Sequence, residues 1–219
     1  MKRYDQDSIA VRAATHIAEV SLFNLKDYKK ALKYYKFIVL YSQNSDERYQ
    51  AQKKIAQIVF ENQSDYKRSI IEYSRLVEIT KKNKEKFFFR KQIAEAYYFL
   101  NQFFQSESEI ELLMAEKPND QEKYDLQLLK GNIKLATKKV DEAIEIYSYL
   151  LNRYPEKSNK DNIALQLAVC YEEKKDFARA IEVLDEMKDG YQIPQFIDQR
   201  IFNLRKRQSH LPGAQGLKK

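Results

Sequence analysis

The segment IALQLAVCYEEKKDFARAIEVL, residues 163–184, contains two amphipathic patterns separated by a charged turn. In its first half, apolar residues recur at intervals of three and four, and the same spacing returns from Phe177 onward. Such intervals place side chains on one face of an α-helix. The turn ends in Asp176, and Asp is a favoured helix N-cap. The segment therefore predicts a hairpin of two antiparallel helices.

The second half of this segment recurs four more times, as DYKKALKYY, DYKRSIIEY, QFFQSESEI and KVDEAIEIY. The five copies follow one another at spacings of 38, 37, 37 and 37 residues. Each copy has a large residue, a small one three positions later and another large one four positions after that. These positions hold, in turn, Tyr28, Tyr66, Phe103, Val140 and Phe177; Ala31, Ser69, Ser106, Ala143 and Ala180; and Tyr35, Tyr73, Ile110, Tyr147 and Leu184. Self-similarity at this period predicts a stack of helical hairpins.

The composition agrees with an all-helical chain. Its 219 residues include only 4 Gly and 4 Pro, and Gly131 is the only glycine before residue 190. β-Sandwiches and barrels need frequent Gly and Pro turns, and phosphate-binding loops need clustered glycines. Both classes are therefore excluded, and the 43% of hydrophobic residues is enough to form an ordered core.

The chain resembles the tetratricopeptide repeat family, whose units pair a helix carrying Leu, a small residue and Tyr with the recurring second helix described above. Pro closes the unit in that family, and Pro118 and Pro155 stand at this position. The first-helix pattern is matched by Leu167, Ala168 and Tyr171, by Ile93, Ala94 and Tyr97, and by Ala56 and Phe60. Residues 147–184 are similar to units of bacterial envelope tetratricopeptide proteins, such as outer-membrane assembly lipoproteins and Tol-associated periplasmic coordinators.

This resemblance implies an all-α solenoid, a right-handed superhelix of antiparallel helix pairs. We expect five hairpins in residues 1–193, a capping helix over 194–210 and a mobile tail over 211–219. The capping helix is predicted from a stripe of apolar residues, Phe196, Ile197, Ile201 and Leu204. The period exceeds the family's usual length, and we place the extra residues in longer loops or an added helical turn.

Catalytic and metal chemistry have little support in this sequence. Cys170 is the single cysteine, and the two histidines, His16 and His210, lie near opposite ends of the chain. A cysteine nucleophile needs a positioned base, and a zinc site needs several ligands together. We therefore predict that the protein is not an enzyme and has no cofactor, and that Cys170 is a small buried apolar residue.

In the family, side chains of the first helix of each hairpin line a concave, peptide-binding groove. Counting back from the small position assigns this groove to Lys54, Ile58, Phe88, Lys91, Tyr98, Phe99, Leu128, Leu135, Leu165 and Val169. The family's carboxylate clamp is rejected because Val20 and Ile58 stand where it needs Asn, although Lys54 and Lys91 could make weaker acidic contacts. Leu128 and Leu135 could equally belong to the core, and two of the three Phe at 87–89 should be core residues.

The charge is concentrated at the C-terminal end of the chain. Residues 199–219 contain six of the seven net positive charges and no acidic residue, which leaves the remainder nearly neutral. A basic patch is predicted at Arg200, Arg205, Lys206 and Arg207. Contact with nucleic acid or anionic membrane through this patch is an alternative function, but a single basic helix lacks base-reading partners, so neither is the partner that we predict.

The function predicted from the sequence is a non-catalytic scaffold that binds another protein or peptide in the groove, without a small-molecule substrate. The oligomeric state stays open. No apolar stretch in the sequence reaches the roughly 20 residues that span a bilayer, and no signal peptide is visible. We therefore expect a cytoplasmic protein, or an envelope assembly factor if an export signal was removed.

Overall fold

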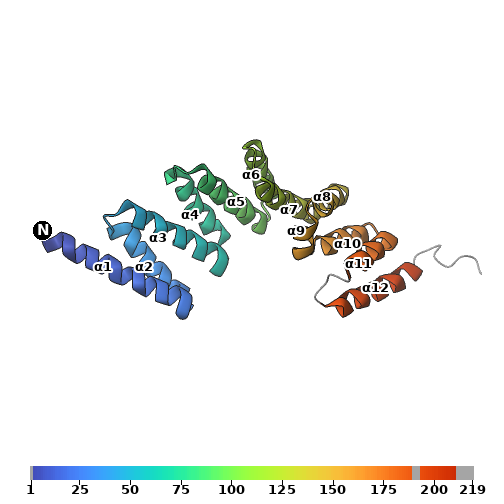
Figure 1. The fold of residues 1–219 in the computed structure, drawn as a ribbon, viewed down its shortest axis with the longest axis horizontal. Coiled ribbons are helices and arrows are strands. Elements are labelled where there is room, and N and C mark those ends of the chain that lie inside the picture. The colour runs from blue at the N-terminus through green and yellow to red at the C-terminus, as the bar shows by residue number, and fades with distance from the viewer. Residues whose placement is uncertain (1, 189–192, 211–219) are drawn as a thin grey trace, which may run out of the picture. The chain divides into compact units, whose positions relative to one another are not determined.

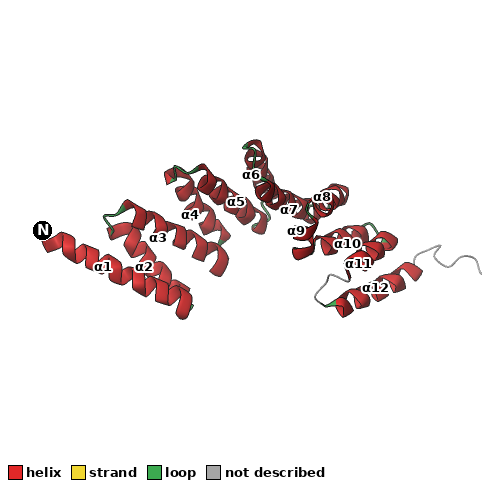
Figure 2. Ribbon diagram, in the orientation of Figure 1, coloured by secondary structure: helices red, strands yellow, loops and turns green. Residues whose placement is uncertain are grey.

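The computed structural model describes residues 2–188 and 193–210, and side chains from Ser8 onward. The described part of the chain is helical throughout, without a strand (Figure 2). The segments 189–192 and 211–219, the latter predicted to be a tail, lie outside the described residues. The helices are α1 (Lys2–Glu19), α2 (Tyr28–Tyr41), α3 (Ser45–Gln57), α4 (Tyr66–Ile79), α5 (Asn83–Phe99), α6 (Phe103–Ala115), α7 (Asp120–Ala136), α8 (Val140–Arg153), α9 (Pro155–Lys160), α10 (Ile163–Glu173), α11 (Phe177–Met187) and α12 (Pro194–Ser209).

The chain forms two compact units, residues Met1–Glu116 and Lys117–Lys219. In the first unit, three hairpins follow one another, α1–α2, α3–α4 and α5–α6, and each helix packs against the next (Figure 1). The second unit contains the hairpins α7–α8 and α10–α11, and α12 packs against α11. The two units together thus contain the predicted tetratricopeptide-type hairpins, and the fold is an all-α helical-repeat fold.

The small position of the repeat is where the two helices of a hairpin approach each other. Its five residues are completely buried: Ala31, Ser69, Ser106, Ala143 and Ala180. The first helix contributes a second small residue to each hairpin, and these are buried too: Ala18, Ala56, Ala94, Gly131 and Ala168. In the third hairpin the Ser106 hydroxyl donates to the Ala94 carbonyl oxygen at 2.7 Å. Small side chains allow the helix backbones to come this close.

The turn inside each hairpin contains one residue in the left-handed conformation, five positions before the small residue. None of the five is glycine: Lys26, Ser64, Asn101, Lys138 and Lys175, with φ between 50° and 62°. In three hairpins an Asp then caps the second helix, since Asp27, Asp65 and Asp176 accept hydrogen bonds from backbone N–H groups three residues later. The sequence analysis predicted the cap at Asp176 but not the left-handed turns.

In the first two hairpins, the first helix ends in a π-helical turn, Val20–Asn24 and Ile58–Asn62. Each turn inserts one residue before the hairpin loop. The Asp65 N–H donates to the carbonyl of Val59, six residues back, whereas in the third hairpin the equivalent Gln102 N–H donates to Tyr97, five back. The π-helical turn of the second hairpin therefore accounts for the one extra residue in the first spacing, 38 instead of 37. In the second unit, the short helix α9 lies between the fourth and fifth hairpins, and its Ser158 hydroxyl donates to the Leu150 carbonyl at 2.8 Å.

The fourth hairpin follows the same register as the others although Gly131 and Lys134 occupy two of its inner positions. Gly131 takes the small position of its first helix, and an added Cβ there would lie 2.8 Å from Cε1 of Tyr147. Lys134 stands where the third and fifth hairpins have Tyr. The Lys134 side chain is buried, and its Nζ lies 2.9 Å from Oε2 of Glu142. The lysine stem thus fills apolar space while its charged end is paired.

The close contact at Gly131 gives a test of the hairpin geometry. Gly131→Ala should lower the free energy of unfolding by about 1–3 kcal/mol, because the new methyl group overlaps the Tyr147 ring. That ring is fixed at its polar end, since the Tyr147 hydroxyl donates to Oδ1 of Asn132 at 2.8 Å. The loss opposes the gain in helix propensity of about 1 kcal/mol that an exposed Gly→Ala change brings. Denaturant titration measures the change.

The control is Lys123→Ala, an exposed position on the same helix, which should change stability little. A Gly131→Ala protein as stable as the parent, or more stable, would contradict the close approach of α7 and α8.

Candidate functional site

The two predicted groove residues of the second hairpin differ in burial. Lys54 is half-exposed, and its Nζ lies 5.5 Å from the centre of the Phe23 ring. Ile58 is only 1% exposed and belongs to the core of the first unit. Its assignment to the groove is wrong, because the π-helical turn shifts the register by one residue. Ile58 thereby takes the inner position that Ile133 and Cys170 hold in later hairpins.

The third hairpin presents an aromatic and charged face on α5. Of the three consecutive Phe, Phe87 and Phe89 are buried and Phe88 is 48% exposed, as expected from their angular spacing on a helix. Lys91 and Glu95 follow on the same side of α5, with Nζ and Oε1 3.7 Å apart. Phe99 completes the face at 49% exposure. These side chains form what we call the α5 face, defined by Phe88, Lys91, Glu95 and Phe99.

Phe99 is held in place by aromatic rings of the hairpin before it. It stacks on Tyr66 at the start of α4, with ring centres 4.7 Å apart and planes inclined by 18°. Phe60 meets Phe99 edge-on at 6.1 Å. Tyr98, another predicted groove residue, is half-buried and packs against Phe103 at 6.0 Å. The C-terminal end of the α5 face is therefore a rigid aromatic cluster at the hairpin turn.

The apolar strip predicted in the second unit is half-buried instead of freely accessible. Leu128 and Leu135 pack against the core formed by α7, α8 and α10. Leu165 packs against the core shared by α10, α11 and α12. Val169 is half-buried on the next turn of α10. The three leucines therefore contribute to the cores of their hairpins while staying partly accessible, and the assignment of these four residues to the groove stays a prediction.

The helix α12 covers the fifth hairpin through three apolar residues. Ile197, Ile201 and Leu204 are buried against the core that includes Phe177 and Leu184, whereas Phe196 is exposed. Pro194 opens the helix, a position where its missing N–H has no intrahelical partner. The sequence pattern therefore identified the apolar face of this helix except for its first member.

The three arginines of the predicted basic patch lie close to acidic residues of the second unit. Arg200 donates from Nε and Nη2 to one carboxylate oxygen of Glu172, at 3.0 and 2.6 Å. Arg207 donates to the other oxygen at 3.0 Å, and Arg205 lies 3.8 Å from Asp185. Lys206 is exposed and has no acidic partner among the described residues. Two arginines of the patch therefore fasten α12 to α10, a role that their sequence position did not reveal.

Few groups in the described structure offer chemistry beyond binding. Burial raises the pKa of the Cys170 thiol to about 11, which leaves little thiolate at neutral pH. Among the side chains that the structure describes, no three His, Cys, Asp or Glu residues are grouped to hold a metal ion. No helix in the described ranges has the length and apolar character to cross a membrane.

Stacked hairpins with exposed aromatic and charged first-helix side chains define a helical-repeat protein with the architecture of an interaction scaffold. Comparison with protein families makes this class more specific. Residues 125–157 and 164–191 match the family model of the tetratricopeptide repeat. These two segments thus match tetratricopeptide repeats, and the described helices have a fold of this type.

Two solved structures are similar to this chain over most of its length. A structure described as the MamA RS-1 ArsTM double mutant superposes with a TM-score of 0.61 and 14% sequence identity, covering 91% of this chain and 96% of MamA. The 41-end form of MamA from Desulfovibrio magneticus RS-1 gives a TM-score of 0.56, again with 14% identity, covering 91% of this chain and 97% of the other. At this identity the similarity concerns the fold alone. Comparison with the curated proteins found no match.

The half-buried state of Leu128 predicts the effect of a charge at this position. Leu128→Glu should lower the free energy of unfolding by about 2 kcal/mol, because a carboxylate would replace apolar contacts with the α7–α8 core. Thermal or denaturant melts measure the loss. Gln166→Glu, on the exposed side of α10, is the control and should melt close to the parent. If the Leu128→Glu protein melts at the same midpoint as the parent, Leu128 is a groove residue and not a core residue.

The attachment of α12 gives a second test. Glu172→Gln keeps the size of the side chain but removes the charge that Arg200 and Arg207 share, and should cost about 1–2 kcal/mol of stability. Hydrogen exchange should show faster exchange of the α12 amides. The neighbouring Glu173→Gln is the matched control, because the Glu173–Lys138 pair is exposed and such pairs contribute little. Equal effects of both changes would contradict the fastening role of Glu172.

Proposed function

We propose that the protein is a non-catalytic scaffold that binds a helix or extended segment of a partner protein along its first-helix faces. The observation that carries this proposal is the α5 face. Two half-exposed Phe rings stand there on a rigid helix, with a charged pair between them. Half-exposed aromatic residues in fixed positions are frequent hot spots of protein interfaces.

The spacing on α5 suits a partner segment that lies along the helix. Phe88 and Phe99 are eleven residues apart, which corresponds to about 16 Å along an α-helix. A partner with apolar side chains at a similar distance would bury both rings, and its polar groups would meet Lys91 and Glu95. This is recognition by apolar anchors and a polar rim, as in helix-in-groove binding.

The ordering of these side chains before binding supports the same role. Phe99 is already stacked on Tyr66, and Phe88 contacts Phe89 edge-on with ring centres 5.7 Å apart. Side chains fixed in advance lose less conformational freedom when a partner binds. In the second unit the corresponding leucines are half-buried, so the α5 face is the better-supported contact surface. The cytoplasmic location inferred from the sequence stays a prediction, as does the envelope alternative.

The proposal predicts that a charge on the α5 face blocks partner capture without unfolding the protein. Phe88→Glu should remove at least one specific protein from those retained in quantitative pull-downs from native lysate, because the carboxylate would have to be desolvated at the interface. The melting temperature should stay close to that of the parent, since Phe88 is half-exposed.

The matched control is Phe104→Glu on α6, where the parent ring is 78% exposed and lies outside the α5 face. This variant should retain the same partners as the parent. If Phe88→Glu keeps every specific partner, or if both variants lose the same proteins, the α5 face is not the binding surface.

A further inference from the structure

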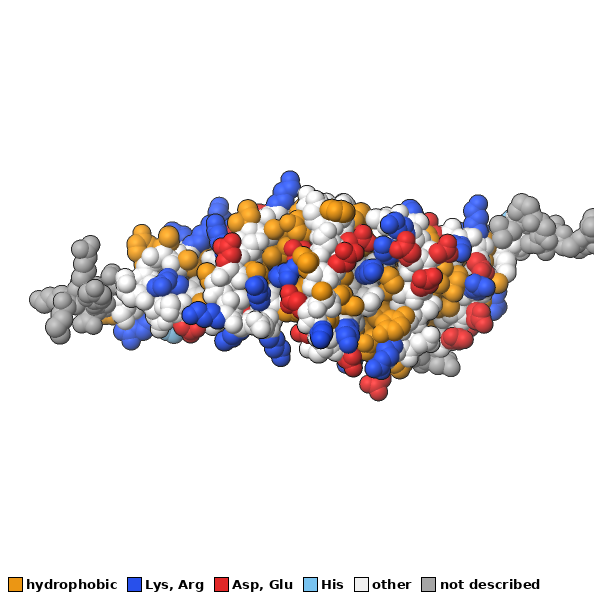
Figure 3. Space-filling view, turned by 90° about the horizontal axis from the view of Figure 1, so that it is seen from above, with side chains coloured by type: hydrophobic (Ala, Val, Ile, Leu, Met, Phe, Trp, Pro, Cys, Tyr) orange, Lys and Arg blue, Asp and Glu red, His pale blue; other side chains and the backbone are white. Residues whose placement is uncertain are grey.

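The nearly neutral total of residues 1–198 conceals a strong separation of charge along the sequence. Residues 26–91 contain 17 Lys and Arg against 8 Asp and Glu, whereas residues 92–198 contain 13 against 21. On the face of the molecule in Figure 3, basic side chains prevail over the N-terminal helices, and acidic ones gather over helices of the second unit. The positive region thus comprises α2, the whole second hairpin and the first half of α5.

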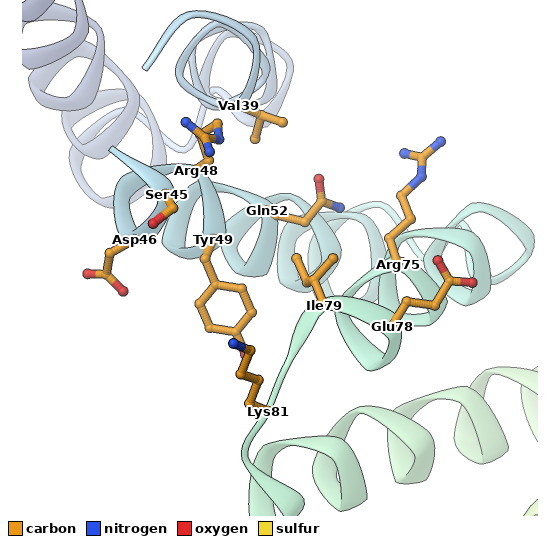
Figure 4. A pocket seen from close by; sticks show the side chains of 10 residues that line it. All are labelled: Val39, Ser45, Asp46, Arg48, Tyr49, Gln52, Arg75, Glu78, Ile79 and Lys81. Atoms are coloured by element: carbon orange, nitrogen blue, oxygen red, sulfur yellow. The ribbon is translucent and has the colours of Figure 1, made fainter. Parts of the chain in front are cut away.

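A pocket of about 700 Å³ lies within this positive region of the first unit, between α2 and α4 with α3 as its floor (Figure 4). It is lined by Val39, Ser45, Asp46, Arg48, Tyr49, Gln52, Arg75, Glu78, Ile79 and Lys81. Gln52 of this lining and Lys54 of the predicted groove are two residues apart, about 200° around the helix. The pocket therefore opens on the side of α3 opposite to Lys54, and we call it the α2–α4 pocket.

The floor of the pocket is fixed by buried polar contacts. The Gln52 amide donates to Oε2 of Glu72 at 2.8 Å, and Arg75 donates to the same oxygen at 2.8 Å. The Tyr49 hydroxyl donates to Oε2 of Glu85 at 2.9 Å, so the ring stands at one wall with its polar end engaged. Hydrogen bonds among α3, α4 and α5 hold these side chains, so the floor of the pocket is formed by helices.

The rim of the pocket combines one apolar contact point with cationic groups. Ile79 is 54% exposed and lies next to Gln52 in Figure 4. Arg48 uses one guanidinium nitrogen for the Ser42 carbonyl at 2.8 Å, and its remaining N–H groups have no hydrogen bond among those that the structure shows. Lys81 is exposed and has no acidic partner among the described residues. Asp46 and Glu78 also lie on the rim, but the surrounding residues 26–91 keep the local field positive.

We infer that the α2–α4 pocket is a second docking site, which takes an acidic amphipathic helix from a partner protein. An apolar side chain of that helix enters beside Ile79 and Val39, and its carboxylates face Arg48 and Lys81. Charge complementarity of this kind speeds association and fixes orientation. Single-stranded nucleic acid fits less well, because it needs several aromatic rings free for stacking, and Tyr49 is the only ring in this lining.

The second unit contains the same type of pocket with the opposite charge. A cavity of about 390 Å³ lies between α8 and α11 over α10, lined in part by Leu151, Ala164 and Glu186. Leu151 follows its small residue by eight positions, as Val39 does, and Glu186 follows Ala180 by six, as Arg75 follows Ser69. Because a carboxylate replaces the guanidinium there, this cavity should reject an acidic helix.

The test uses fluorescence anisotropy with a labelled amphipathic peptide of leucine and glutamate, about four helical turns long. The intact protein should bind this peptide, and binding should weaken with salt. Ile79→Asp and Lys81→Glu should each weaken it about tenfold, by removing the apolar contact and by placing like charges together. The same peptide with Gln in place of Glu should bind more weakly than the acidic one.

Two changes of the same kind outside the pocket are the controls. Leu112→Asp on α6 replaces a residue that is also 54% exposed, and Lys67→Glu reverses an exposed lysine at the start of α4. Both should bind the acidic peptide nearly as the parent does, and circular dichroism melts should show all four variants folded. The inference would be overturned if the pocket and control variants weakened binding equally, or if the parent did not bind the peptide. It would also be overturned if a single-stranded oligonucleotide bound more tightly than the peptide and its binding were insensitive to Ile79→Asp.

Discussion

The structure depends on one steric constraint, the close approach of the two helices in each hairpin. A pair of small residues stands at every crossing, and in the third hairpin the distance is short enough for the Ser106 hydroxyl to reach the Ala94 carbonyl on the other helix. Once these helices are in contact, large residues one turn away must interlock around the crossing, as Tyr147 does beside Gly131. Packing of the larger side chains follows from this constraint.

The periodic part of the fold could be predicted from the sequence, because the same packing problem recurs every 37 or 38 residues. The backbone irregularities could not, since they depend on hydrogen bonds and not on residue class. One signal was nevertheless present: Ala56 and Phe60 are four residues apart, whereas Ala94 and Tyr97 are three apart. That difference marks the π-helical turn and explains why the prediction for Ile58 failed.

The surfaces were harder to predict than the core, for two physical reasons. A helix position can face a neighbouring helix and still be half-exposed, so counting from the small residue could not separate Leu128 from a true groove residue. The sequence of a basic patch also does not show which carboxylates pair with it. Glu172, the partner of Arg200, lies on another helix, 28 residues earlier in the chain. By contrast, the exposure of one Phe among the three at 87–89 followed directly from helical geometry.

The left-handed turns have a consequence for how the hairpins open. A residue other than glycine in this conformation carries a steric penalty of roughly 1–2 kcal/mol, and every hairpin contains one such residue, a lysine, a serine or an asparagine. Each turn is thus a strained link whose release partly offsets the packing lost when its hairpin separates. Local opening, followed by proteolytic nicking, should accordingly begin at these five links. The weakest points of the chain are spaced as regularly as its core.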